Sequence, residues 1–134
     1  MRFFDSVVVL DTGDEVIATL QRFASEHVTT SAFFHGLGAF QEATIAWWNP
    51  QTLHYKDIGI DEQVEVLSIQ GNLTRVKDGF KVHAHVVLGT HRGAAIGGHL
   101  KRGIVHPTLE LYLATTSDVL HRKRDEATGL DLIR

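Results

Sequence analysis

The sequence contains no cysteine, and this absence limits the chemistry open to the chain. Disulfide bonds, thiolate catalysis and cysteine-rich zinc folds are all excluded. A metal ion of soft or borderline character would have to be bound by imidazole and carboxylate groups instead. Histidine is the metal-binding residue that the chain does have, with nine copies among 134 residues.

A long apolar run and an excess of positive charge are also lacking. The opening residues, MRFFDSVVVLDTGDE, predict neither a signal peptide nor a membrane span, so we expect a cytoplasmic protein. The net charge of -3 gives no general attraction to nucleic acids, which proteins bind largely through phosphate contacts. The one basic cluster, HRKR at 121–124, is followed directly by Asp125 and Glu126. This pattern favours a charged, solvated face or turn.

The chain has the size and composition of one compact domain covering residues 1–134. No linker, internal repeat or low-complexity tract divides it. Residues 2–10 are rich in β-branched and aromatic side chains and predict a strand. Thr12 and Glu15 then have the spacing of a capping box, which predicts the start of a helix. Side chains at helical spacing follow at Val16, Leu20, Phe23, Ala24 and His27.

From residue 31 onward the pattern predicts strands separated by short turns, and no second long helix. In VEVLSIQGNL the alternation changes phase between Val66 and Leu67, which indicates a β-bulge or a strand buried on both faces. The simplest architecture is an α+β fold in which one N-terminal helix packs on a largely antiparallel sheet.

Four of the nine histidines lie within KVHAHVVLGTHRGAAIGGHL, residues 81–100. Alternation along a strand puts the apolar side chains of residues 80–88 on one face and His83 and His85 on the other. Two residues on one face of a strand are about 7 Å apart at the backbone, a separation from which two imidazoles can converge on one ion. His99 is the best third ligand, because Gly97 and Gly98 before it permit a tight turn that returns its ring over the sheet.

The next strand, IVHPTLELYL, offers further groups on the same face. If its leucines point into the core, His106 and Glu110 point toward the side of the sheet that carries His83 and His85. Either residue could complete the site. The plainer alternative is that these histidines are solvated or hydrogen-bonded residues on a polar strand face.

Other common sites find no support in the sequence. HGLGAF has only two glycines, and GAAIGG is not followed by the lysine and hydroxyl of a phosphate-binding loop, so no nucleotide cofactor is expected. None of the serines lies in the context of a nucleophile elbow.

The order of several segments resembles the plants-and-prokaryotes-conserved (PPC) domain over nearly the whole chain. The segments are HGLGAF, EATIAWWNPQTLHY, VEVLSIQGNLTR, VHAHVVLG, IGGHL and VHPTLELYL, with a TGLDLI tail. The resemblance implies a curved, mainly antiparallel sheet flanked by a helix, assembled as a homotrimer. It also implies that His83, His85 and His99 match a three-histidine cluster that binds a metal, most plausibly zinc, in some prokaryotic members. The DNA-binding label of the family rests largely on the AT-hooks of plant relatives, and this chain has no R-G-R-P hook.

Three functions follow from these observations. The first is a homotrimeric metal-binding module that binds a small molecule or a partner protein, with a regulatory role. The second is a zinc-dependent hydrolase or lyase with an open coordination position, in which Glu110 is the general base or the fourth ligand. The third is a DNA-binding regulator, which would need Arg92, Lys101, Arg102 and the 121–124 cluster to gather on one face.

The aromatic residues Trp47, Trp48 and Tyr55 bear on the trimer. A strand face that carries them beside a histidine pocket is a surface that a neighbouring subunit could cover. The alternative is that the tryptophans are core residues. Adjacent strand residues point in opposite directions, so the two tryptophans need not share one environment.

Overall fold

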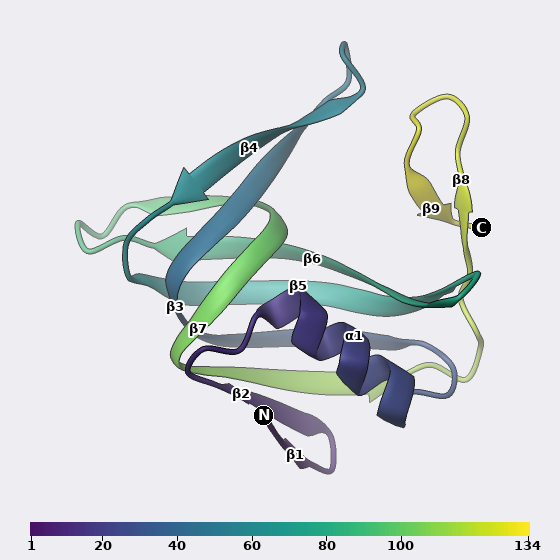
Figure 1. Cartoon of the computed structure of the whole chain (residues 1–134), viewed down its shortest axis with the longest axis horizontal. Helices are drawn as coiled ribbons and strands as arrows, with labels where there is room; N and C mark the ends of the chain where they lie inside the picture. Colours follow the sequence, from purple (N-terminus) through teal and green to yellow (C-terminus); the bar gives the residue numbers. More distant parts are fainter.

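A computed structural model describes residues 1–134, with one helix and nine strands (Figure 1). The helix α1 spans Val16–His27. The strands are β1 (Arg2–Phe4), β2 (Val7–Asp11), β3 (Ala32–Asn49), β4 (His54–Ile60), β5 (Val64–Val76), β6 (Gly79–Gly89), β7 (Ala95–Thr115), β8 (Arg122–Arg124) and β9 (Asp131–Ile133). Seven of them form an antiparallel sheet in the order β1-β2-β7-β6-β5-β3-β4, which confirms the α+β class. No helix in the structure has the length and apolar character needed to cross a membrane.

The helix begins one turn later than a capping box at Thr12 would require. Glu15 is itself the N-cap, and its carboxylate accepts hydrogen bonds from the backbone N–H groups of Ile17 (3.2 Å) and Ala18 (2.8 Å). The capping-box prediction is wrong because the chain before Glu15 is held by β7. Gly13 donates its N–H to the carbonyl of Val105 (2.9 Å), so this stretch pairs with a strand and cannot coil.

The core lies between α1 and one face of the sheet. In β6 the alternate side chains of Phe80, Val82, Ala84, Val86 and Leu88 are all buried, as the strand pattern predicted. In β7, Leu109 and Leu111 are fully buried, and Leu113 packs against the same cluster. The helix adds Val16, Leu20, Phe23 and Ala24 from its inner side. The opposite side of the sheet, which we call the outer face, carries the alternate residues and is not covered by α1.

The strand β7 bends and pairs with three other strands (Figure 1). Its residues 95–99 pair with β6, its residues 108–112 pair with β2, and β3 runs beside most of its length. The register of β3 against β5 shifts between Gly36 and Gly38, and the register of β5 against β6 shifts between Val66 and Ser68. The second shift confirms the bulge indicated by the sequence, and such irregularities increase the local bend of a sheet.

The strands β8 and β9 form a separate hairpin near the C-terminus (Figure 1). A parallel bridge between Arg75 and His121 joins the start of this hairpin to β5, and Lys81 of β6 forms an ion pair with Asp131 of β9 (3.0 Å). The hairpin therefore lies beside β5 and β6. His83 and His85 are both on β6.

The close pairing of β3 with β7 depends on glycine. A Cβ atom added to Gly38 would overlap the carbonyl oxygen of Thr108 and lie 2.7 Å from the Cα of Leu109. We expect Gly38→Ala to lower the free energy of unfolding by about 1–3 kcal/mol, as overpacking of a closely packed site does. Gly59→Ala is the matched control, because nothing lies within 4 Å of the added atom, and it should change stability by about 0.5 kcal/mol or less. Chemical denaturation measures both. Equal effects of the two substitutions would contradict the close approach.

Candidate metal centre

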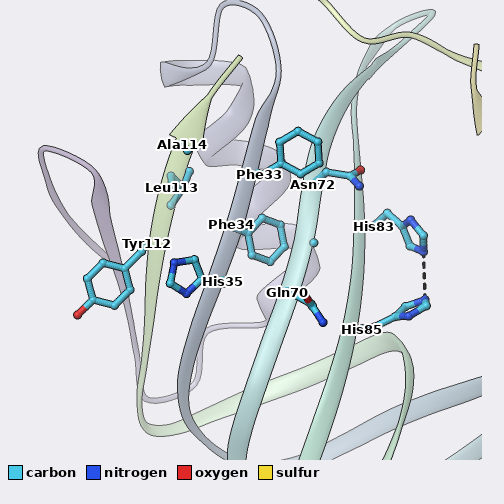
Figure 2. A pocket seen from close by; sticks show the side chains of 11 residues that line it. Phe33, Phe34, His35, Gln70, Asn72, His83, His85, Tyr112, Leu113 and Ala114 are labelled. Atoms are coloured by element: carbon cyan, nitrogen blue, oxygen red, sulfur yellow. Dashed lines mark hydrogen bonds between the residues drawn. The ribbon is translucent and has the colours of Figure 1, made fainter.

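His83, His85 and His99 come together on the outer face of the sheet. His83 and His85 are two residues apart on β6, and their Nε2 atoms are 3.2 Å apart (Figure 2). His99 lies on β7 directly opposite His85 in the strand register. One ring nitrogen from each of the three lies within 4.8 Å of the others. The structure thus brings together the three residues that the sequence pattern singled out.

The two glycines before His99 do not form the tight turn that the sequence predicted. Gly97 and Gly98 lie in extended strand, and the turn between β6 and β7 falls earlier, where Gly93 has a φ of 76°. A Cβ atom at Gly97 would lie 2.6 Å from the carbonyl oxygen of Val86, and one at Gly98 would lie 2.8 Å from that of Ala46. The two glycines allow β7 to lie close to its neighbours, and the strand pairing, not a turn at these glycines, positions His99.

The ring of His99 is held by aromatic residues of the β3–β4 hairpin. Tyr55 stacks on it with 4.8 Å between ring centroids, and Trp48 packs against Tyr55 at 5.2 Å. Trp48 is half-buried, whereas Trp47 is 55% exposed, so neither tryptophan is a buried core residue. The Nδ1 atom of His99 is buried without a hydrogen-bond partner. An unpaired buried polar atom is costly, typically by about 1–3 kcal/mol, and calls for a ligand that would satisfy it.

Two of the three imidazoles are neutral at physiological pH. Burial lowers the pKa of His83 to about 4, and the nearby positive charge of Arg122 adds to the shift. Burial likewise lowers the pKa of His99 to about 4, with a further contribution from His85. Metal ions bind the neutral form of histidine, so the environment of the cluster keeps these two side chains in the form that binds.

Arg122 of the β8–β9 hairpin reaches the cluster from the edge of the sheet. Its Nη2 donates to the Oδ1 of Asn72 (2.9 Å) and lies 3.3 Å from the Nδ1 of His83. The same guanidinium donates to the hydroxyl of Thr74 (2.8 Å) and to the backbone carbonyl of Asp131 (2.7 Å). We expected the cluster 121–124 to form a charged, solvated face or turn. Lys123 and Arg124 are exposed, but Arg122 is partly buried, because the C-terminal segment folds back against β5. No local pattern signals this return.

A cavity of about 530 Å³ lies on the outer face beside His83 and His85 (Figure 2). Four of its polar side chains come from one cross-strand row, in which His85 pairs with Gln70, Gln70 with His35, and His35 with Tyr112, and the neighbouring pair Asn72 and His83 adds two more. The rings of His35 and Tyr112 stack at 5.6 Å. Apolar walls come from Phe33, Phe34, Leu113 and Ala114. Sequence reasoning missed this row because only the strand register places its members side by side.

Glu110 and His106 lie away from the cluster. Glu110 pairs with Leu37 of β3 and with Val9 of β2, far along β7 from the residues 95–99 that pair with β6, so at this position β3 and β5 separate it from β6. Three strand spacings of about 4.8 Å amount to roughly 14 Å along the sheet. His106 is exposed, and its ring lies 3.3 Å from the hydroxyl of Thr12. Neither residue contacts the three histidines of its own chain.

The fold and the cluster define a class of small α+β proteins in which a helix packs on a bent antiparallel sheet with three histidines on its outer face. The chain belongs to the Plants and Prokaryotes Conserved (PCC) domain family, whose model matches residues 4–117. This match confirms the resemblance drawn from the sequence segments. Residues 118–134, which contain Arg122, lie beyond the matched region.

Three solved structures are similar over most of the chain. A protein from Bacteroides thetaiotaomicron, named as a candidate DNA-binding protein, has a TM-score of 0.92 at 25% identity and covers 99% of this chain and 94% of its own. A plant- and prokaryote-conserved protein from Pyrococcus horikoshii has a TM-score of 0.88 at 26% identity, with coverage of 96% and 89%. A metal-containing protein from Archaeoglobus fulgidus has a TM-score of 0.87 at 27% identity, with coverage of 100% and 99%.

One curated protein, the bifunctional protein GlmU from a Synechococcus strain, is 29% identical over 120 residues. The match covers 87% of this chain and 18% of that protein, so the chain spans about a fifth of the length of the curated relative it matches.

The lowered pKa values of His83 and His99 predict a pH effect on the metal-free protein. Both groups take up protons less readily when folded than when unfolded, so protonation favours the unfolded chain. We expect the free energy of unfolding to fall as the pH drops from about 6.5 toward 4, the interval between their ordinary and folded pKa values. The double variant His83→Gln with His99→Gln should lose most of this slope. His54→Gln, at an exposed position at the start of β4 and outside the cluster, should keep it. Denaturation curves at several pH values with a chelator present measure the slope, and an unchanged slope in the double variant would contradict the neutral cluster.

Proposed function

We propose that the protein is a homotrimeric zinc-binding module whose outer-face cavity binds a small ligand at the metal, and that His83, His85 and His99 are the protein ligands. The observation that carries the proposal is the geometry of the cluster. Zinc binds imidazole nitrogens at about 2.0–2.1 Å in tetrahedral sites, so two ligand nitrogens lie about 3.3 Å apart. The 3.2 Å between the Nε2 atoms of His83 and His85 fits this spacing.

The chemistry of the donor set supports a metal of borderline softness. All three side chains are imidazoles, two of them held neutral, and the buried Nδ1 of His99 has no protein partner. Imidazole favours zinc and its transition-metal neighbours over calcium or magnesium, which prefer oxygen ligands. The metal-containing relative from Archaeoglobus fulgidus, which is 27% identical, points in the same direction.

Three protein ligands leave one coordination position of a tetrahedral ion for an exogenous group, and bound zinc would supply a Lewis acid there. The cavity beside His83 and His85 is the space open to that group. The alternative of a hydrolase or lyase needs a proton acceptor near the same position. No carboxylate lines the cavity, and Glu110, the base suggested by the sequence, lies three strands away in its own chain. Ligand binding is therefore the function that the residues support best.

The trimer is supported by the apolar side chains on the outer face. Large exposed hydrophobic residues gather on β3, β5, β6 and β7 at Phe33, Leu37, Leu67, Val87 and Tyr112. Several large apolar side chains exposed on one face of a sheet favour an interaction site, and neighbouring copies of the chain would cover them together with the cavity.

Direct DNA binding has less support from the charges. Lys101 forms an ion pair with Asp57 (2.6 Å), and Arg102 forms one with Glu42 (2.6 Å). Two of the cations needed for a basic surface are thus already neutralised by carboxylates within the chain, and the net charge is negative. Phosphate contacts depend on cations that are free to replace counterions.

Metal content tests the proposed centre. We expect about one zinc ion per chain in protein that is purified without a histidine tag and measured by elemental analysis, since one cluster of three imidazoles forms one site. His83→Ala with His85→Ala removes two ligands and should abolish binding, whereas His54→Ala, outside the cluster, should retain the metal. Wild-type protein that stays free of metal after incubation with zinc would contradict the proposed centre.

Subunit mass tests the proposed trimer. Light scattering during gel filtration should give the mass of three chains for the wild type. Leu37→Asp places a carboxylate in the apolar patch and should yield monomers, because an unpaired charge is costly to bury in an interface. Leu53→Asp changes a residue of similar exposure in the β3–β4 turn and should leave the trimer intact. A monomeric wild type would overturn this part of the proposal.

A further inference from the structure

The guanidinium of Arg122 faces a nitrogen of the cluster in an orientation that conflicts with metal binding. Guanidinium groups only donate hydrogen bonds, so the Nδ1 of His83, at 3.3 Å, must accept. A neutral imidazole carries a single ring proton, which then resides on the Nε2 of His83. That proton points to the Nε2 of His85 at 3.2 Å. The contact with Arg122 therefore fixes the tautomer of His83.

Metal loading would reverse this tautomer. The Nε2 of His83 binds a metal through the lone pair that replaces its proton, and the neutral ring then carries its proton on Nδ1. Histidines bound to metals almost always donate this second N–H to a carboxylate, a carbonyl or a water. In this chain the group opposite Nδ1 is Nη2 of Arg122, another donor. Two donors repel each other, so the guanidinium has to leave Nδ1 when the metal binds.

The charges around the cluster indicate what the released guanidinium would bind. Lys81 is paired with Asp131 (3.0 Å) and Lys101 with Asp57 (2.6 Å), whereas Arg122 has no carboxylate within 4 Å and is influenced by the charge of Asp131 only from farther away. No acidic side chain lines the cavity beside the histidines. A divalent ion bound by three neutral imidazoles would add further positive charge. An anion is therefore the ligand that the site lacks, and a planar carboxylate matches the fork of an arginine.

Resting on the proposed metal centre, we propose that Arg122 and the metal-loaded cluster together bind a small carboxylate. The carboxylate occupies the open position at the metal and accepts hydrogen bonds from the guanidinium, which it draws away from the Nδ1 of His83. Anion and metal consequently strengthen each other's binding, and this coupling is reciprocal. Figure 2 shows Asn72, the other partner of this Nη2, beside His83, and both residues line the cavity, so the guanidinium that contacts them lies next to the space open to the carboxylate.

The experiment measures zinc affinity by competition with a chromogenic chelator, in acetate and in chloride at equal ionic strength. For the wild type we expect acetate to raise the affinity about 5-fold or more, the lower range of allosteric coupling. Acetate also binds free zinc weakly, which would act against the expected rise. Arg122→Gln replaces the donor with an amide whose oxygen can accept from Nδ1–H. Because the opposed donor is removed, it should bind zinc about 10-fold tighter than the wild type in chloride, an effect of the size that partners of metal ligands have on affinity, and should not respond to acetate.

Arg124→Gln is the matched control. Arg124 lies in the same hairpin, but its side chain is 70% exposed and comes no closer than 3.9 Å to its acidic neighbour Asp131. This variant should keep the wild-type affinity and the wild-type response to acetate. Zinc binding of Arg122→Gln that is equal to or weaker than that of the wild type would overturn the proposal. An acetate response of equal size in Arg122→Gln and wild type would do the same. Absence of zinc from all three proteins would instead overturn the metal centre itself.

A second measurement needs no variant. Nitrogen NMR of the metal-free wild type should find His83 with its proton on Nε2 and an unprotonated Nδ1. The opposite tautomer would remove the contact on which the proposal rests.

Discussion

The register between β6 and β7 is the constraint on which the candidate site depends. It places His99 opposite His85, and it holds only because β7 also pairs with β3 at a distance that glycines permit. A slip of one residue in either strand would turn its side chains to the other face of the sheet. The histidine cluster would then be lost together with the buried leucines of β7. The same alternation of side chains therefore determines both the core and the site. For this reason the histidines lie on the face of the sheet opposite the well-packed apolar side chains.

The outer face combines two properties that would be unfavourable in a monomer exposed to water. It presents large apolar side chains, and beside them it keeps His83 and His99 partly buried and neutral. Withdrawal from water lowers the pKa of an imidazole, because desolvation penalises the charged form. A neighbouring subunit on this face would deepen that withdrawal. Assembly and metal binding would thus favour the same protonation state of the cluster, and each would make the other easier.

The sequence was sufficient for everything that depends on local alternation. The buried face of β6, the leucines of β7 and the shared face of His83 and His85 all follow from a period of two residues, whereas the bulge after Val66 was one of two interpretations that the alternation left open. The errors concern features fixed by distant partners. Thr12 lost its capping role because the adjacent backbone pairs with β7, and Glu110 shares the outer face with the histidines but lies three strands away. The face of the sheet to which a side chain points is a local property of its strand. The distance between two side chains on the same face depends on the order of the strands, which cannot be read from a single sequence.

Arg122 illustrates the same distinction at the site. Its neighbours in sequence are charged, so local composition favours a solvated turn, yet its hydrogen bonds run to Asn72, Thr74 and His83, about 40 to 50 residues earlier in the chain. These bonds stabilise the metal-free cluster, since the proton on Nε2 of His83 bridges to His85 and leaves no two imidazole lone pairs opposed between them. The site would then be ordered both with and without the metal, and the two forms would differ in their hydrogen bonds. In the proposed scheme the energy difference between them would depend on one donor, Arg122 of the C-terminal hairpin, which lies beyond the region that matches the family model. Variation in that segment could therefore change the affinity of the centre without any change to its ligands.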